Sequence, residues 1–128
     1  GCGSGVLAIA ALALGAGTAV GVDVDPAARS ATAANAGRNR VADRLAVVDD
    51  VARAGGRYDL VVANLLLPQH RSVAHAVAGV VAEGGRVVVS GVLAAQRAEV
   101  EAAYRSGGLD VRAHRADDGW LALTLAAR

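Results

Sequence analysis

The sequence of 128 residues contains no methionine and no phenylalanine, and it has only one cysteine, one tryptophan and two tyrosines. A single cysteine excludes a disulfide bond within the chain, and no secretory signal is visible, so the cytoplasm is the expected location. The longest apolar stretch, residues 6–14, is about half as long as a membrane-spanning helix needs to be. The sequence therefore predicts no membrane segment.

The chain also has no large excess of positive or negative charge. The 13 basic and 12 acidic side chains are spread along the chain and give a net charge of +1. Because no basic stripe is available to neutralise a run of phosphates, we expect no direct binding of nucleic acid.

The length is that of one domain, which can bury a single core but cannot hold a catalytic domain together with a separate substrate domain. Residue 1 is not methionine, and it already lies inside a glycine-rich motif, without the strand that ordinarily leads into such a motif. We therefore expect residues 1–128 to be part of a longer protein.

Short aliphatic runs alternate with alanine-rich segments along the chain. Strands are predicted at residues 19–24, 45–48, 60–63 and 86–89, helices at 6–14, 26–36, 69–81 and 93–105, and a hairpin at 109–115 and 120–125. Because strands and helices alternate and the strand segments are apolar throughout, we predict an α/β fold with a mostly parallel sheet buried on both faces. One antiparallel pair, the C-terminal hairpin, would close the sheet.

Three spaced glycines and one acid point to a nucleoside-carrying cofactor. Gly1, Gly3 and Gly5 precede the first predicted helix, and Asp23 ends the next strand about 20 residues later. Glycines let the backbone approach a ligand closely, and the acid is placed to accept both hydroxyls of a ribose. A dinucleotide motif needs glycine or alanine where this chain has Val6. The G-x-G-x-G motif followed by Asp-x-Asp-Pro instead resembles that of the S-adenosylmethionine-dependent methyltransferases. The resemblance implies that S-adenosylmethionine is bound by Gly1, Gly3, Gly5 and Asp23.

The second acid of this segment, Asp25, is predicted to cap the helix that begins at the next residue. The alternative is that Asp23 and Asp25 exchange roles. Asp49 and Asp50 follow the strand predicted at 45–48, and two readings of them stay open, a contact with the adenine amino group or a solvated loop.

Longer motifs carry a family resemblance. They are residues 1–16 (GCGSGVLAIAALALGA), 21–26 (GVDVDP), 62–66 (VANLL), 90–93 (SGVL) with Gln96, and Trp120. On these residues the whole chain resembles the bacterial methyltransferases that modify ribosomal protein eleven of the large subunit. The glycine motif and the acid are shared with all class I methyltransferases, whereas the Asn-Leu-Leu and Ser-Gly-Val-Leu segments are specific to the narrower family.

The resemblance implies a Rossmann-like class I methyltransferase domain over residues 1–128, preceded in the family by a small domain that recognises the ribosomal protein and is absent from this sequence. It implies the strand order 3-2-1-4-5-7-6 with the first strand missing, so residues 1–128 alone would bind the cofactor weakly or not fold. The implied activity is methyl transfer from S-adenosylmethionine to lysine or α-amino groups of a ribosomal protein. We expect a monomer.

Asn64 is the predicted catalytic residue, and we also expect it to contact the cofactor. It ends a predicted strand, at the edge where ligands gather in open α/β sheets. Its side-chain oxygen and nearby carbonyls would accept hydrogen bonds from an amine and direct the nitrogen lone pair at the sulfonium methyl for in-line displacement. Because no dedicated base is visible, most of the rate would come from orientation. A helix-capping or turn role is the alternative.

The segment after Asn64 favours a protein amine over a nucleobase. Base-modifying enzymes usually continue with Pro-Pro-aromatic, which stacks on a flipped base, whereas this chain continues with Leu65-Leu66-Leu67-Pro68. A methyltransferase of small molecules or nucleic acid and an inactive remnant remain the alternatives. Trp120 is expected to pack in the core. The spacing of His70, His75 and His114 predicts no metal site.

Overall fold

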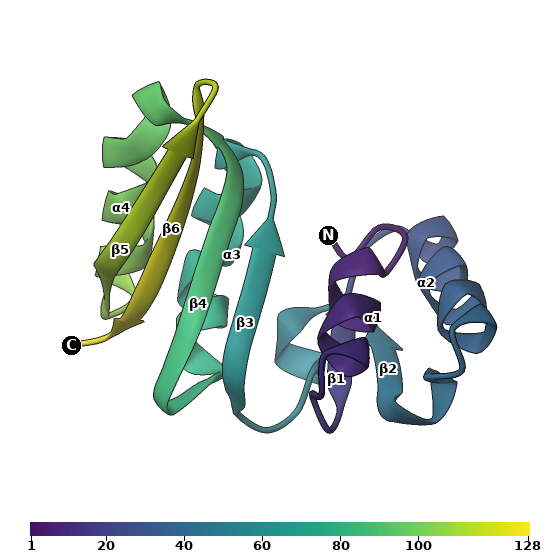
Figure 1. Cartoon of the computed structure of the whole chain (residues 1–128). Coiled ribbons are helices and arrows are strands. Elements are labelled where there is room, and N and C mark those ends of the chain that lie inside the picture. The colour runs from purple at the N-terminus through teal and green to yellow at the C-terminus, as the bar shows by residue number, and fades with distance from the viewer. The chain divides into compact units, whose positions relative to one another are not determined.

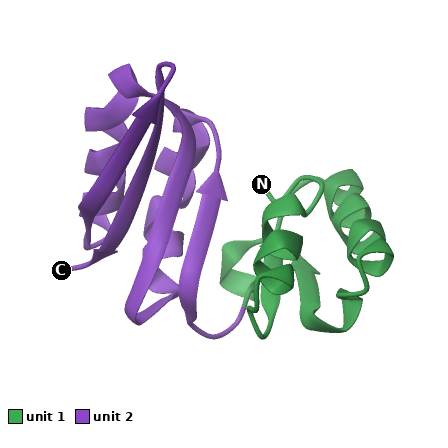
Figure 2. Ribbon diagram, in the orientation of Figure 1, with its two compact units in different colours: residues 1–54 green, residues 55–128 purple.

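The computed structural model describes residues 1–128, which divide into two compact units, residues 1–54 and 55–128 (Figure 2). The first unit contains α1 (Val6–Ala13), β1 (Ala19–Val22), α2 (Pro26–Arg38) and β2 (Leu45–Val48). The second contains β3 (Tyr58–Asn64), α3 (Leu67–Gly79), β4 (Val81–Leu93), α4 (Arg97–Ser106), β5 (Leu109–Asp117) and β6 (Trp120–Ala127). None of these helices combines the length and the hydropathy that crossing a bilayer demands.

The first unit is built on two parallel strands, β1 and β2. Helix α1 packs against β1 and α2 against β2 (Figure 1), around a small core of Leu12, Ala36, Val41 and Leu45. Helix α2 begins as predicted, because the backbone N–H of Ala27 donates to Asp25 Oδ1 at 2.9 Å. It was predicted to end at residue 36, but it continues through Gly37 and ends at Arg38.

The second unit is a four-stranded sheet with the order β3-β4-β6-β5 (Figure 1). Strands β3 and β4 are parallel, whereas β6 is antiparallel to both β4 and β5. Helices α3 and α4 lie on the same face of the sheet, and the core between the two layers contains alternate residues of the strands, such as Val87 and Val89 of β4 and Leu123 and Leu125 of β6. The predicted hairpin turns at Asp118 and Gly119, which both have positive φ.

The predicted α/β class is confirmed, and the strand order within each of the two units agrees with the implied order. The implied order contains the neighbours 3-2 and 4-5-7-6 on the two sides of strand one, and these are the orders within the two observed sheets. Two antiparallel pairs are present where one was expected, because β6 is inserted between β4 and β5.

Two predictions about the strands were wrong in detail. Strand β4 has 13 residues and begins at Val81, well before the strand predicted at 86–89, while α3 ends at Gly79 and not at residue 81 as predicted. Strand β3 is not buried on both faces, because Leu60 is 52% exposed and Val62 is 41% exposed. Both helices of this unit cover the opposite face, so these two side chains have no layer above them within the unit.

Candidate functional site

Two side chains of α2 hold the glycine-rich loop in place. The hydroxyl of Thr32 donates to the carbonyl oxygen of Gly3 at 3.0 Å, and Nδ2 of Asn35 donates to the carbonyl oxygen of Ser4 at 2.9 Å. Thr32 is completely buried, and its Oγ1 also lies 3.3 Å from Sγ of Cys2. Helix α2, which follows β1, therefore fixes the conformation of the loop. Neither of these two contacts was predicted from the sequence.

Gly5 is the residue at which the loop turns into α1. Its φ is +83°, and a Cβ atom at this position would lie 2.8 Å from Cγ2 of Thr32, closer than real side chains approach. Helix α1 therefore begins at Val6. The backbone N–H groups of its first turn have no partner within the helix and can bind an anionic group.

Asp23 directs its carboxylate at the loop. The N–H of Gly3 donates to Oδ2 and the N–H of Asp25 donates to Oδ1, each at 3.0 Å. Burial raises the pKa of Asp23, whereas the hydrogen bonds from the N–H groups of Gly3 and Asp25 lower it, and on balance this pKa lies below its ordinary value. The ionised carboxylate has about four acceptor positions, and two remain for the hydroxyls of a ribose.

The loop also leaves room for a ligand. No atom lies within 4 Å of the position that a Cβ at Gly3 would take, although the N–H of Gly3 is bonded to Asp23. The ionised carboxylate of Asp23 can accept hydrogen bonds from the ribose diol of S-adenosylmethionine. The unpaired N–H groups at the start of α1 can bind its carboxylate, and the open space at Gly3 lets the cofactor approach. The residues of the first unit therefore fit this cofactor.

Asp49 and Asp50 both have partners close to them in sequence. Asp50 Oδ1 accepts a hydrogen bond from the N–H of Ala52 at 2.8 Å and so caps the 3₁₀ turn Val51–Arg53. Asp49 forms an exposed ion pair with Arg53 at 3.2 Å. These contacts give both acids a role in their own turn.

Asn64 lies at the last position of β3, opposite Ser90 of β4. Its Nδ2 donates to Oγ of Ser90 at 2.8 Å. The N-cap of α3 is Leu66, whose N–H donates to Oε1 of Gln69 at 2.9 Å. Asn64 is therefore not a helix cap, and its side chain is oriented by the neighbouring strand.

The glycine after Ser90 brings the two strand ends together. Gly91 has a φ of +82°, and a Cβ here would lie 2.6 Å from the carbonyl oxygen of Leu65 and 3.2 Å from Oδ1 of Asn64. In addition, the N–H of Leu65 donates to the carbonyl oxygen of Ser90 at 3.1 Å. The Ser-Gly dipeptide thus has a physical role, because only glycine allows this approach of backbone to backbone.

A buried histidine lies behind this junction. His70 is fully buried, with Nε2 at 2.9 Å from the carbonyl oxygen of Ser90 and Nδ1 at 2.8 Å from the hydroxyl of Tyr104. A carbonyl can only accept, so Nε2 carries the proton and Nδ1 accepts from Tyr104. Burial lowers the pKa of His70 and raises that of Tyr104, which keeps both side chains neutral. From the sequence, His70 had been considered only as a possible metal ligand.

Asn64 lines a groove of about 570 Å³ in the second unit. Its lining includes Leu66, Ser90, Gly91, Asp117 and Trp120. Trp120 is 54% exposed, so the prediction that it packs in the core was wrong. It is the first residue of β6 and points to the face opposite the buried Leu121. The groove combines apolar side chains such as Leu66 and Trp120 with the amide of Asn64 and with two charged side chains, Arg115 and Asp117. Its apolar part can hold an aliphatic chain, and the amide of Asn64 can bind an amine at the end of that chain.

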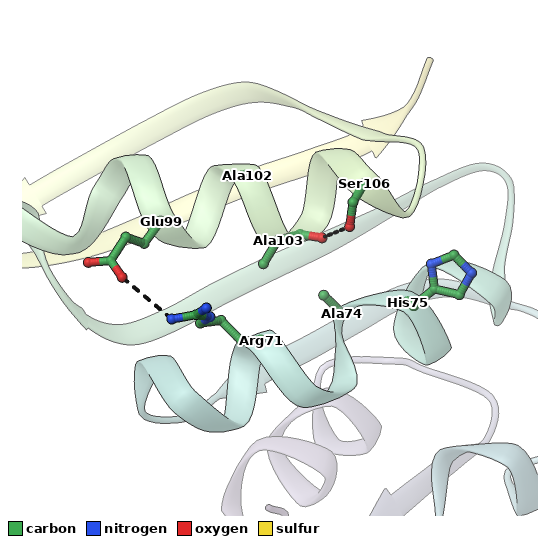
Figure 3. Close-up of a pocket in the computed structure, with 7 residues that line it drawn as sticks. All are labelled: Arg71, Ala74, His75, Glu99, Ala102, Ala103 and Ser106. Carbon is green, nitrogen blue, oxygen red and sulfur yellow. Dashed lines mark hydrogen bonds and ion pairs between the residues drawn. The ribbon is translucent and has the colours of Figure 1, made fainter.

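A second cavity, of about 360 Å³, lies between α3 and α4 (Figure 3). Arg71 and Glu99 form an ion pair across it at 3.7 Å, and both side chains are more than half exposed. Exposed pairs of this kind contribute little to stability. None of the predicted site residues lines this cavity, so it is not the candidate site.

The family model and the curated relatives that match this chain carry the same description. The family model described as "Ribosomal protein L11 methyltransferase (PrmA)" matches residues 1–128. Proteins with this name from Xylella fastidiosa (strain Temecula1) and Chromohalobacter salexigens are 48% identical over 121 residues and 46% identical over 125 residues, and the matches cover 94% and 97% of this chain. The chain spans only 39% and 42% of the lengths of these two relatives.

Solved structures agree with the predicted fold. The structure of a ribosomal protein L11 methylase from Lactobacillus delbrueckii subsp. bulgaricus matches with a TM-score of 0.93 and 28% identity, covering 100% of this chain and 67% of that one. A putative RNA methyltransferase from Pyrococcus horikoshii, at 21% identity and a TM-score of 0.82, supports the fold alone. The predicted α/β class I methyltransferase fold is confirmed.

Proposed function

We propose, from the premise that this chain belongs to the ribosomal protein L11 methyltransferase family, that it is the catalytic part of an enzyme that methylates amines of that ribosomal protein. The observation that carries the proposal is the carboxylate of Asp23, bonded to the glycine loop in a chain whose whole length matches the family. The methylated groups would be lysine side chains and α-amino groups, and the enzyme would act as a cytoplasmic monomer.

The first unit would hold the cofactor. When bound, S-adenosylmethionine supplies an electrophilic methyl group on a positively charged sulfur. Asp23 would accept hydrogen bonds from the two ribose hydroxyls, and these charge-assisted bonds are stronger than those of a neutral acceptor. The unpaired N–H groups at the start of α1 would donate to the cofactor's carboxylate. Gly1, Gly3 and Gly5 would line its methionine part, with open space at Gly3 and the turn into α1 at Gly5.

The second unit would bind the amine. Asn64 Oδ1 and the carbonyl groups at the ends of β3 and β4 would accept hydrogen bonds from the nitrogen and so orient its lone pair. The amine must be neutral to react, whereas a free lysine has a pKa of about 10.4. Leu66 and Trp120 in the groove would remove water from the amine, which lowers its pKa. We also propose that Asn64 contacts the cofactor.

Methyl transfer by the full-length protein that contains this chain tests the function. The protein is incubated with tritiated-methyl S-adenosylmethionine and with purified large-subunit ribosomal proteins, and the labelled species is identified by electrophoresis. We expect label in ribosomal protein eleven. Label in ribosomal RNA or in a small molecule would favour another substrate class, and the absence of label from every fraction would contradict an enzymatic role.

Asp23→Asn is expected to weaken binding of S-adenosylmethionine by about tenfold or more, because hydrogen bonds to a charged acceptor are worth about 1.5–3 kcal/mol each. The matched control is Asp25→Asn, in which asparagine remains a good helix cap and affinity should stay within about twofold. Isothermal calorimetry measures both. Equal affinity of Asp23→Asn and wild type, or a loss confined to Asp25→Asn, would mean that Asp23 is not the ribose ligand.

A further inference from the structure

We propose that His70 is a positioning residue for Asn64 and acts on it through Ser90. This inference deepens the proposed function and rests on it for its kinetic consequence. His70 is completely buried and does not line the groove, so it cannot touch a substrate. Its effect must therefore pass through the residues that it holds.

The path from His70 to Asn64 consists of two hydrogen bonds that share one residue. Nε2 of His70 donates to the backbone carbonyl of Ser90 at 2.9 Å, and the hydroxyl of Ser90 accepts from Nδ2 of Asn64 at 2.8 Å. Ser90 therefore has its backbone fixed from the core side and its side chain engaged on the groove side. The hydrogen bond to Ser90 limits rotation of the side-chain amide of Asn64, so Oδ1 of Asn64 stays available to a substrate amine.

The ring of His70 is itself locked. Its Nδ1 accepts from the hydroxyl of Tyr104 at 2.8 Å, and the two rings meet edge to face with centroids 5.8 Å apart. Tyr104 belongs to α4 and is fully buried in the core. A ring with one tautomer and one orientation can fix the Ser90 carbonyl, whereas an apolar side chain at this position would leave that carbonyl one donor short.

Two variants of similar polarity separate this role from a general effect on folding. In His70→Gln the side-chain amide reaches the place of Nε2 and can still donate to Ser90. In His70→Asn the shorter amide reaches the place of Nδ1 and contacts Tyr104 instead. His75→Asn is the control, because His75 is an exposed histidine of the same helix that lies outside the groove.

We expect His70→Asn to lower kcat about tenfold with an unchanged Kd for S-adenosylmethionine, and His70→Gln to stay within about threefold of wild type. In an Asn64→Ala background, His70→Asn should cause no further loss of kcat, because the group that it positions is gone. Two results would overturn the proposal. One is that His70→Asn lowers kcat by the same factor in wild type and in Asn64→Ala, and the other is that His70→Asn and His70→Gln have the same kcat.

A second readout does not depend on activity. In the full-length protein without cofactor, the side-chain amide protons of Asn64 should exchange with solvent faster in His70→Asn than in wild type, His70→Gln or His75→Asn, as measured by NMR. Unchanged exchange in His70→Asn would overturn the proposal even if kcat fell. A wild-type protein that shows no methyl transfer would contradict the proposed function, while the exchange rates would still decide the role of His70.

Discussion

Gly91→Ala is expected to lower the free energy of unfolding by about 3 kcal/mol or more, the largest stability effect that we predict for a single methyl group. The new Cβ would lie 2.6 Å from the carbonyl oxygen of Leu65 and 2.9 Å from its nitrogen. Both are backbone atoms at the junction of β3 and α3, so they cannot move aside as the end of a flexible side chain could. The strand ends that hold Asn64 would have to separate.

Gly108→Ala is the control that isolates this contact. Gly108 has a φ of +89°, close to the +82° of Gly91, but no atom lies within 4 Å of the position of its Cβ. Its substitution should cost only the strain of a left-handed residue, about 1 kcal/mol or somewhat more. Urea denaturation of both variants gives the comparison. Similar losses for Gly91→Ala and Gly108→Ala would show that the approach to Leu65 does not matter.

Asn64→Ala is expected to reduce kcat about 100-fold, the magnitude typical for removal of a preorganised polar group from an active site. The affinity for S-adenosylmethionine should change by less than about threefold, because Asp23 and the loop would supply most of the binding. The substituted side chain is exposed at the end of β3 and bonds only to Ser90, so folding should not be affected severely. Steady-state kinetics and calorimetry on the same preparation measure the two quantities.

Ser90→Ala provides a graded comparison. It leaves Asn64 in place but removes the hydroxyl that accepts from Nδ2, so kcat should fall less than in Asn64→Ala. An Asn64→Ala variant that keeps the turnover of wild type would remove this residue from the mechanism. A loss of cofactor affinity as large as the loss of kcat would assign Asn64 to cofactor binding alone.

Features with local causes could be predicted from the sequence. The strand at Leu45–Val48 and the cap at Asp25 depend on neighbours within a few residues, and both occur as predicted. The position of Asp23 at the glycine loop was also predicted, because a strand that follows a helix returns to the loop that precedes it. The start of β4 at Val81 was missed because it depends on the pairing of Val81 with Tyr58, which is far away in the sequence.

The support of the site could not be predicted, because its contacts join residues that are far apart in the sequence. Thr32 reaches Gly3 across 29 positions, and His70 reaches Tyr104 across 34. No spacing rule connects a threonine within a helix to an earlier loop. The direction of the Trp120 side chain depends on the register in which β6 pairs with β4. A shift of this register by one residue would turn the side chain to the other face of the sheet.

The position of the cofactor's ribose tests the proposed role of Asp23 most directly. A crystal structure of the full-length protein with S-adenosylhomocysteine would show it. We predict that both ribose hydroxyls lie within about 3 Å of the carboxylate of Asp23, with the glycine loop in contact with the nucleoside. A nucleoside bound elsewhere, with the carboxylate of Asp23 bonded only to Gly3 and Asp25, would contradict it.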